Sequence, residues 1–184
     1  MGGYMSHDFI GTRYTDLRIA TTARGGVSAP TLANVNATGI YAYQFTGGAD
    51  ELHFSVQLPH GWDQGILYPH IHWCNSATWT SGTVTWTMDY IVTKPNGDTV
   101  FSGKQTITAT GGTSGTAYGS HVAEFPDIDL TNIGGIDYTS ISTLMLVRLS
   151  RSANTMNAGN PFLLEFDIHY GIRSPGTINT NIEP

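Results

Sequence analysis

Cysteine and basic residues are scarce in this chain. Its 184 residues include one cysteine, Cys74, and only eight lysines and arginines, for a formal net charge of −6. A single cysteine cannot form a disulfide within the chain, which excludes a small scaffold held together by disulfides. The scattered basic residues lack the clustered positive charge that binds a phosphate backbone. We therefore expect no nucleic-acid partner, and a single domain that is stabilised by its own core.

Long apolar runs are absent as well. No segment approaches the roughly 20 consecutive apolar residues of a membrane span, and the amino end lacks the basic and apolar regions of a signal peptide. We expect no membrane partner and no export by the general secretory pathway. Helical periodicity of apolar residues is also missing, so the fold class must come from another pattern.

That pattern is the alternation of apolar and polar residues. It is clearest in residues 51–58, where Leu52, Phe54 and Val56 alternate with polar side chains, as in a half-buried strand. It returns in residues 83–93, where Trp86 belongs to the apolar face. We expect Trp86 and Phe54 to be largely buried between facing strands.

Strand patterns that end at Gly, Pro, Asn or Asp recur along the chain. They predict about eight strands, at residues 40–46, 51–58, 70–74, 83–93, 99–108, 121–125, 142–151 and 162–170. The strand at 142–151 is apolar on both faces and should be the most buried. Antiparallel strands without a helix indicate an all-β fold, an antiparallel β-sandwich that is jelly-roll-like. Its usual winding puts the first, third, sixth and eighth strands in one sheet and the others in the second.

The sandwich should occupy residues 39–171. Residues 1–38 are rich in Gly, Thr, Ala and Arg and show little periodicity beyond a short possible strand at residues 17–20. We interpret them as an extended N-terminal arm that becomes ordered on a neighbouring subunit; the alternative is a terminus that is disordered in the isolated protein. Residues 172–184 are a C-terminal tail rich in Pro, Gly and Asn.

His70 and His72 are the strongest candidates for a chemical site. Residues i and i+2 of a strand share one face at a spacing of ~6.6 Å, so two imidazoles can approach one metal ion. The cupin family uses such a pair on this fold, with a glutamate a few residues later. Residues 73–78 contain no glutamate, and a second cupin motif is missing. We therefore expect no metal and no cofactor; should a metal be found, the candidate ligands are His70, His72, Glu165 and His169, which the predicted winding brings together beside Asp167.

Other catalytic interpretations are weaker, and we expect no enzyme activity. Cys74 could be a nucleophile, but a lone thiol at a strand end is more often a packing residue. The acid pairs Asp127/Asp129 and Glu165/Asp167 could serve a glycosidase, yet paired acids on exposed strands and turns are mostly solvated. A sugar-stacking platform remains an alternative to the simpler interpretation as core or interface aromatics; it would consist of Tyr41, Tyr43, Trp62, Trp79 and Tyr118.

Five short motifs occur in a fixed order: LHFSVQLPHGW, YPHIHW, TVTWTMDY, LMLVRLSR and LLEFDIHY. In this order they resemble a family of small proteins that tailed bacteriophages and prophages encode among their virion structural genes. The match covers about residues 50–171. The resemblance implies a β-sandwich component of the particle, such as a capsid cement (decoration) protein or a head or tail accessory protein, and it supplies no catalytic residues.

On this basis we expect a virion structural protein, made in the host bacterial cytoplasm and placed on the capsid surface. Its partners would be the major capsid protein and further copies of itself, with a homotrimer as the expected state, because closed oligomers match the symmetric junctions of a shell. The alternatives are a tail or head-fibre accessory protein, a carbohydrate-binding module, or a cupin-like metal-binding protein.

Overall fold

The computed structural model describes residues 13–19, 24–25, 28–97 and 99–172. The regular structure in these ranges consists of strands and two short 3-10 helices, η1 (Val35–Ala37) and η2 (Pro95–Gly97). Neither helix has the length or the apolar content needed to cross a membrane. Residues 1–12 and most of the predicted C-terminal tail lie outside the described ranges.

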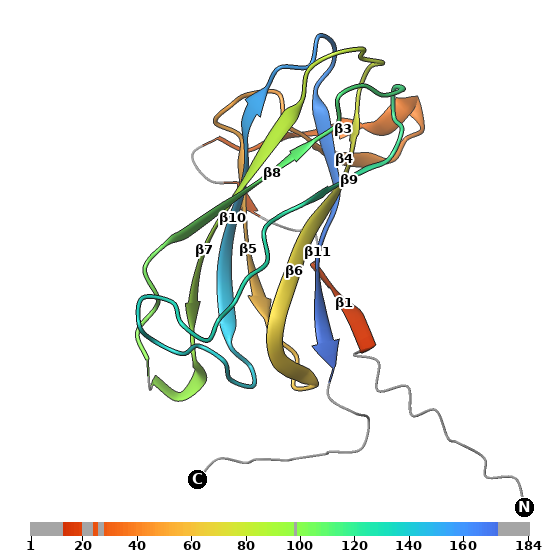
Figure 1. Ribbon diagram of the computed structural model, residues 1–184. Coiled ribbons are helices and arrows are strands. Elements are labelled where there is room, and N and C mark those ends of the chain that lie inside the picture. The colour runs from red at the N-terminus through yellow and green to blue at the C-terminus, as the bar shows by residue number, and fades with distance from the viewer. Residues whose placement is uncertain (1–12, 20–23, 26–27, 98, 173–184) are drawn as a thin grey trace, which may run out of the picture.

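Two antiparallel sheets face each other (Figure 1). The first has the order β3 (Thr31–Asn34), β4 (Tyr41–Gln44), β11 (Pro161–Ile172), β6 (Trp62–Asn75) and β9 (His121–Glu124), and β1 (Arg13–Ile19) also pairs with β11. The second has the order β2 (Arg24–Gly25), β5 (Glu51–Gln57), β10 (Leu144–Asn154), β7 (Val84–Thr93) and β8 (Gln105–Gly111).

This arrangement is the predicted jelly-roll-like sandwich. The predicted first, third, sixth and eighth strands are β4, β6, β9 and β11, and all four lie in one sheet. The other four are β5, β7, β8 and β10, and they lie in the opposite sheet. The predicted partition of strands between the two sheets is therefore confirmed.

The core lies between the sheets and contains all four tryptophans, Trp62, Trp73, Trp79 and Trp86, each 1% exposed or less. Trp86 packs edge-on against Phe45, with 5.0 Å between ring centroids. The inward face predicted for residues 83–93 is confirmed by Trp86. Phe54 is only half-buried; it packs against the core with its ring centroid 5.0 Å from that of Phe166.

β10 is central in its sheet, as its apolar sequence indicates, but it is not buried on both faces. Met145 and Val147 face the core, whereas Leu146 is exposed on the outer face. The prediction that both faces of this strand are covered is therefore wrong for Leu146.

Two strands begin far from their predicted first residues. β6 begins at Trp62, although the prolines and glycines before residue 70 predicted a loop; its first half pairs with the end of β11, where Leu67 lies opposite Tyr170. β8 begins at Gln105 rather than at residue 99. Before it, Ser102 donates its backbone N–H to Val92 O and accepts the Val92 N–H with its hydroxyl, so a side chain replaces part of the regular ladder.

A β-bulge interrupts β11. Leu163 pairs with Trp73 and Glu165 with His72, so Leu164 is an extra residue without a partner in this ladder. Leu163 is consequently buried and Leu164 exposed, although strict alternation with the buried Phe166 and Ile168 predicts the reverse. A bulge changes the face to which the following side chains of a strand point. After the bulge at Leu164, the alternation places Glu165 on the outer face of the sheet.

The described part of the predicted arm belongs to the sandwich. β1 pairs with β11 over the whole of Arg13–Ile19, and β3 forms a hairpin with β4. The predicted short strand at residues 17–20 lies partly within β1. The β-sandwich therefore includes Arg13–Ile19 and the β3–β4 hairpin, whereas the sequence pattern predicted an extended arm up to residue 38.

Candidate functional site

A row of polar side chains crosses the outer face of the six-stranded sheet where β6 meets β11. His70 lies opposite Asp167 and His72 opposite Glu165. Because alternate residues of a strand share a face, His169 joins Glu165 and Asp167 on the same side. The predicted neighbourhood of these five residues is confirmed. His53, which the winding assigned to the opposite sheet, is found there on β5.

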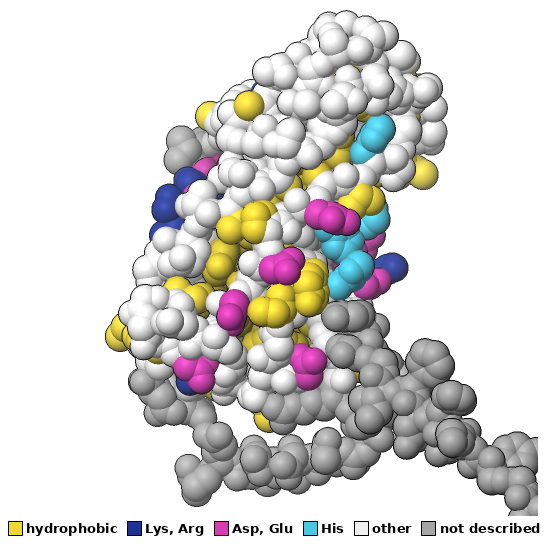
Figure 2. Space-filling model, in the orientation of Figure 1, with side chains coloured by type: hydrophobic (Ala, Val, Ile, Leu, Met, Phe, Trp, Pro, Cys, Tyr) yellow, Lys and Arg dark blue, Asp and Glu magenta, His cyan; other side chains and the backbone are white. Residues whose placement is uncertain are grey.

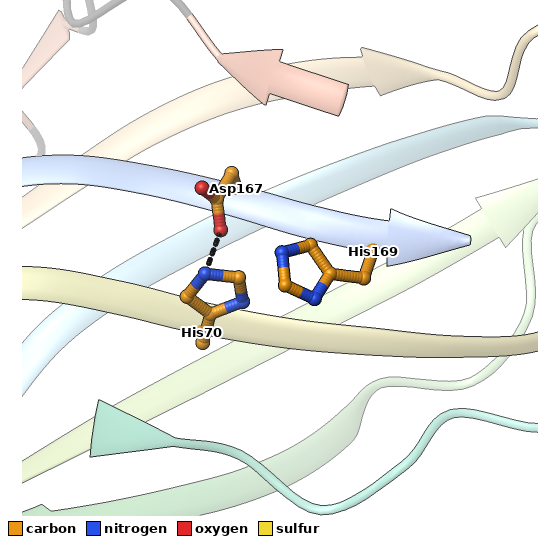
Figure 3. A group of neighbouring side chains, drawn as sticks. All are labelled: His70, Asp167 and His169. Carbon is orange, nitrogen blue, oxygen red and sulfur yellow. Dashed lines mark ion pairs between the residues drawn. The ribbon is translucent and has the colours of Figure 1, made fainter. Parts of the chain in front are cut away.

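Asp167 lies at the centre of this row and is only 3% exposed. Its Oδ1 lies 2.6 Å from Nε2 of His70 and its Oδ2 lies 3.7 Å from Nε2 of His72. The imidazole of His169 packs beside that of His70, with 4.3 Å between ring centroids. Figure 3 shows both rings turned toward the carboxylate.

The close approach of His70 to Asp167 lacks the alignment of a hydrogen bond, and Oδ1 accepts no hydrogen bond from the described residues. Burial raises the pKa of the Asp167 carboxyl above its usual range, while positive charge on the neighbouring histidines acts in the opposite direction. The site therefore holds a desolvated carboxylate whose charge is incompletely satisfied.

A groove of about 720 Å³ lies over this row. Acidic side chains of Glu124 and Asp127 line it next to the histidines, and Tyr68 and Phe125 add aromatic surface. Figure 2 shows histidine and acidic side chains gathered on this face beside apolar ones. The outer face of the sheet is thus hollowed and chemically mixed.

β1 closes one side of the groove. Asp16 Oδ1 lies 2.8 Å from Nε2 of His169, and Nε of Arg18 lies 3.4 Å from Oε1 of Glu165. Both residues lie in the segment whose composition predicts an arm, so they are not among the site residues predicted from the sequence. The polar and apolar alternation of residues 15–19 is the signal that could have found them.

Cys74 is buried on β6, opposite Phe162, and burial raises the pKa of its thiol. A buried thiol of raised pKa is a packing residue rather than a nucleophile. The acid pair Asp127/Asp129 is divided between two roles. Asp127 lines the groove, whereas Asp129 accepts the backbone N–H of Thr131 in a turn, which lowers its pKa.

The aromatic platform does not form. Trp62 and Trp79 are core residues, so the simpler interpretation of these two aromatics is confirmed. Tyr41 is exposed on the β3–β4 hairpin, Tyr43 is half-buried on the same hairpin, and Tyr118 contacts Phe162. Burial of the two large indoles removes the surface on which a sugar ring would stack.

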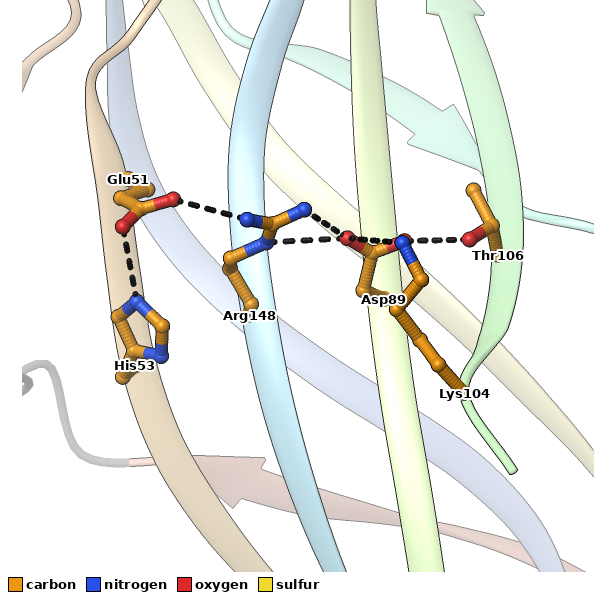
Figure 4. Close-up of polar contacts among 6 residues, drawn as sticks. All are labelled: Glu51, His53, Asp89, Lys104, Thr106 and Arg148. Atoms are coloured by element: carbon orange, nitrogen blue, oxygen red, sulfur yellow. Dashed lines mark hydrogen bonds and ion pairs between the residues drawn. The ribbon is translucent and has the colours of Figure 1, made fainter. Parts of the chain in front are cut away.

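A second polar cluster crosses the outer face of the other sheet (Figure 4). Arg148 on β10 links Asp89 on β7, 2.9 Å from its Nε, to Glu51 on β5, 3.3 Å from its Nη1. Thr106 donates its hydroxyl to Asp89, and the amine of Lys104 lies 3.7 Å from the same carboxylate. The charges pair with one another, so the cluster joins four strands and has the character of a structural crosslink.

No protein-family model matches the chain, and no curated protein matches its sequence. Solved structures with a similar course of the chain include a carbohydrate-binding module specific for non-crystalline cellulose (CBM28), 15% identical over 75% of this chain and 78% of that one, with a TM-score of 0.40. A second is CBM35 of Cellvibrio japonicus Abf62. It is 15% identical over 88% of this chain and 99% of that one, with a TM-score of 0.39.

A third is the CBM22-1–GH10 pair of Clostridium thermocellum xylanase 10B in complex with xylohexaose; it is 10% identical over 83% of this chain and 25% of that one, with a TM-score of 0.38. Such low identities and TM-scores identify no ligand for this chain. The function has to be inferred from the groove itself.

Proposed function

We propose that this chain is a non-catalytic binding protein whose groove over β6, β9 and β11 takes an oligosaccharide. The observation that carries the proposal is the groove of about 720 Å³ with carboxylates, imidazoles and an arginine around aromatic surface. Pockets of some 300–1,000 Å³ with a few convergent polar groups on apolar walls are typical of small-ligand sites.

The polar groups suit a ligand rich in hydroxyls. Ionised carboxylates accept hydrogen bonds, and a guanidinium donates them in a fixed geometry. Sugar hydroxyls can do both, and the ring of Tyr68 offers an apolar face with a polar tip. The predicted alternative of a carbohydrate-binding module is therefore kept, with this groove as the proposed sugar site in place of the aromatic platform.

The ion pairs in the groove support a binding role rather than a catalytic one. Asp16 is paired with His169, Glu165 with Arg18 and Asp167 with His70. A glycosidase needs one carboxyl to act as a proton donor and a second as base or nucleophile. Carboxylates that face a guanidinium or an imidazole in this way can instead serve as positioned hydrogen-bond acceptors for a ligand.

Titration calorimetry against a panel of soluble oligosaccharides tests the proposal. We expect at least one glycan to bind, and Tyr68→Ala and Arg18→Ala to weaken that binding by about tenfold each, the effect of one lost ring contact or charged hydrogen bond. Lys104→Ala is the matched control, because it removes a charge from the opposite sheet. Absence of binding across the panel, or an equal loss in the control, would contradict the proposal.

We propose a virion structural role as the second candidate, with further copies of the chain and the major capsid protein as partners at the capsid surface. The family resemblance supports it, and so does the β3–β4 hairpin. There Leu32 is 58% exposed, Ile40 69% and Tyr41 58%. Neighbouring exposed apolar side chains are typical of a protein-protein contact.

Light scattering with size-exclusion chromatography tests this candidate. We expect a homo-oligomer, with a trimer as the working expectation, and a shift to monomers when Leu32, Ile40 and Tyr41 are replaced together by serine. Far-UV circular dichroism of the variant controls for folding. A monomeric wild-type chain that is also absent from purified particles would refute the virion role.

A further inference from the structure

The floor of the groove brings together ligand atoms from three side chains. One donor atom each of His70, Asp167 and His169 lies within 4.8 Å of the other two. We propose that these residues form a binding site for one divalent transition metal of the zinc type. The incomplete cupin pattern led us to expect no metal, but this set is built across two strands rather than from one HxH strand and a following glutamate.

The state of Asp167 is the independent observation that points to a ligand. Its side chain is 5% exposed, and its Oδ1 accepts no hydrogen bond from the described residues. A buried carboxylate oxygen without a hydrogen bond costs free energy. A metal ion at this position would supply the missing interaction and neutralise the desolvated charge.

The donor set selects the class of metal. Two imidazole nitrogens and one carboxylate oxygen suit zinc and its first-row neighbours. Calcium and magnesium prefer sets made only of oxygens. His70, Asp167 and His169 all line the groove, so the fourth ligand of a tetrahedral ion would come from the groove.

The geometry needs only small adjustments. Two ligands at 2.0–2.1 Å from a tetrahedral zinc ion are about 3.3 Å apart, whereas His70 Nε2 and Asp167 Oδ1 are 2.6 Å apart. Rotation of the imidazole and the carboxylate about their last torsions, which are broad, can open this contact by the required amount. The donor atoms of His70, Asp167 and His169 lie up to 4.8 Å apart, and similar side-chain rotations would bring the more distant ones together.

Asp16 on β1 contacts one of the three proposed ligand residues, His169. Its Oδ1 lies 2.8 Å from Nε2 of His169 and so restricts the orientation of that imidazole. Carboxylates commonly orient metal-bound histidines in this way.

The test uses the full-length chain, freed of metal with a chelator and titrated with Zn²⁺ by calorimetry and with Co²⁺ by visible absorption. We expect one ion per chain and the d–d absorption bands of cobalt held by nitrogen and oxygen ligands. His70→Ala, His169→Ala and Asp167→Asn should each weaken Zn²⁺ binding by at least about 100-fold, since even residues behind a ligand contribute 10–100-fold.

His53→Ala is the matched control, because it removes an imidazole from the opposite sheet and should leave the affinity unchanged. Unfolding of each metal-free variant shows whether it still folds, and the conservative Asp167→Asn keeps the shape of the side chain. The proposal would be overturned if the wild-type chain bound no zinc in excess metal, or if it preferred Ca²⁺ to Zn²⁺. It would also be overturned if the three variants bound Zn²⁺ as tightly as the wild type. The titrations contain no glycan, so failure of oligosaccharide binding does not affect their outcome.

Discussion

Replacing Trp86 by alanine should destabilise the sandwich by about 3–5 kcal/mol. The indole lies on β7, is fully buried, and packs edge-on against Phe45. A buried tryptophan removes roughly 150–250 Å² from water, which at about 25 cal/mol per Å² amounts to ~4–6 kcal/mol. Loss of the edge-to-face contact adds to the cost. Loss of the indole N–H, which has no partner among the described residues, subtracts from it.

Urea unfolding followed by far-UV circular dichroism measures this difference. Trp86→Phe is the matched variant, because it keeps a ring beside Phe45 and removes the unpaired N–H, so it should lose less than half as much stability as the alanine variant. A loss below about 1 kcal/mol for alanine, with the native spectrum retained, would mean that Trp86 does not lie in a tightly packed core. Equal losses for both variants would show that ring packing is not the source of the stability.

Three further predictions concern the second sheet and one turn. Arg148→Met leaves the buried carboxylate of Asp89 without its main partner and should cost about 1–3 kcal/mol at pH 7; an unchanged urea midpoint would refute this. Burial would raise the pKa of Asp89, but hydrogen bonds from Thr106 and Arg148 and nearby positive charge outweigh it and hold the pKa below its ordinary value of 3.8. The stability that ionised Asp89 contributes is therefore complete above pH 3.8 and is lost as the pH falls below that value toward the folded-state pKa. The free energies of unfolding of wild type and Arg148→Met should converge in this acid range. A constant difference between them at all pH values would contradict the pairing of Asp89 with Arg148. Gly82→Ala should lower the thermal midpoint by an amount equivalent to about 1–3 kcal/mol, because Gly82 has φ +89° and a Cβ there would lie 2.0 Å from Thr155 O; an unchanged midpoint would show that the turn can shift.

The sequence alone determined which residues face the core in several strands and how the strands divide between two sheets. Alternation is a local property, since successive side chains of any strand point to opposite faces. It therefore identified Trp86 as a core residue and placed His70 and His72 on a common face. Turn residues mark most strand ends for the same local reason.

Tertiary structure decided what the local pattern cannot encode. β6 starts at Trp62 because β11, distant in sequence, supplies hydrogen-bond partners that override local loop signals. The bulge at Leu164 exchanges the faces of two leucines, although both are equally apolar in the sequence.

The candidate site depends on the same long-range pairing. Asp167 meets His70 through the register between β6 and β11, and Asp16 reaches His169 because β1 pairs with the far edge of β11. The predicted winding brings the histidines and acids of β6 and β11 together. The register, the burial of Asp167 and the approach of Asp16 depend on contacts summed over whole sheets, so only the fold decided them.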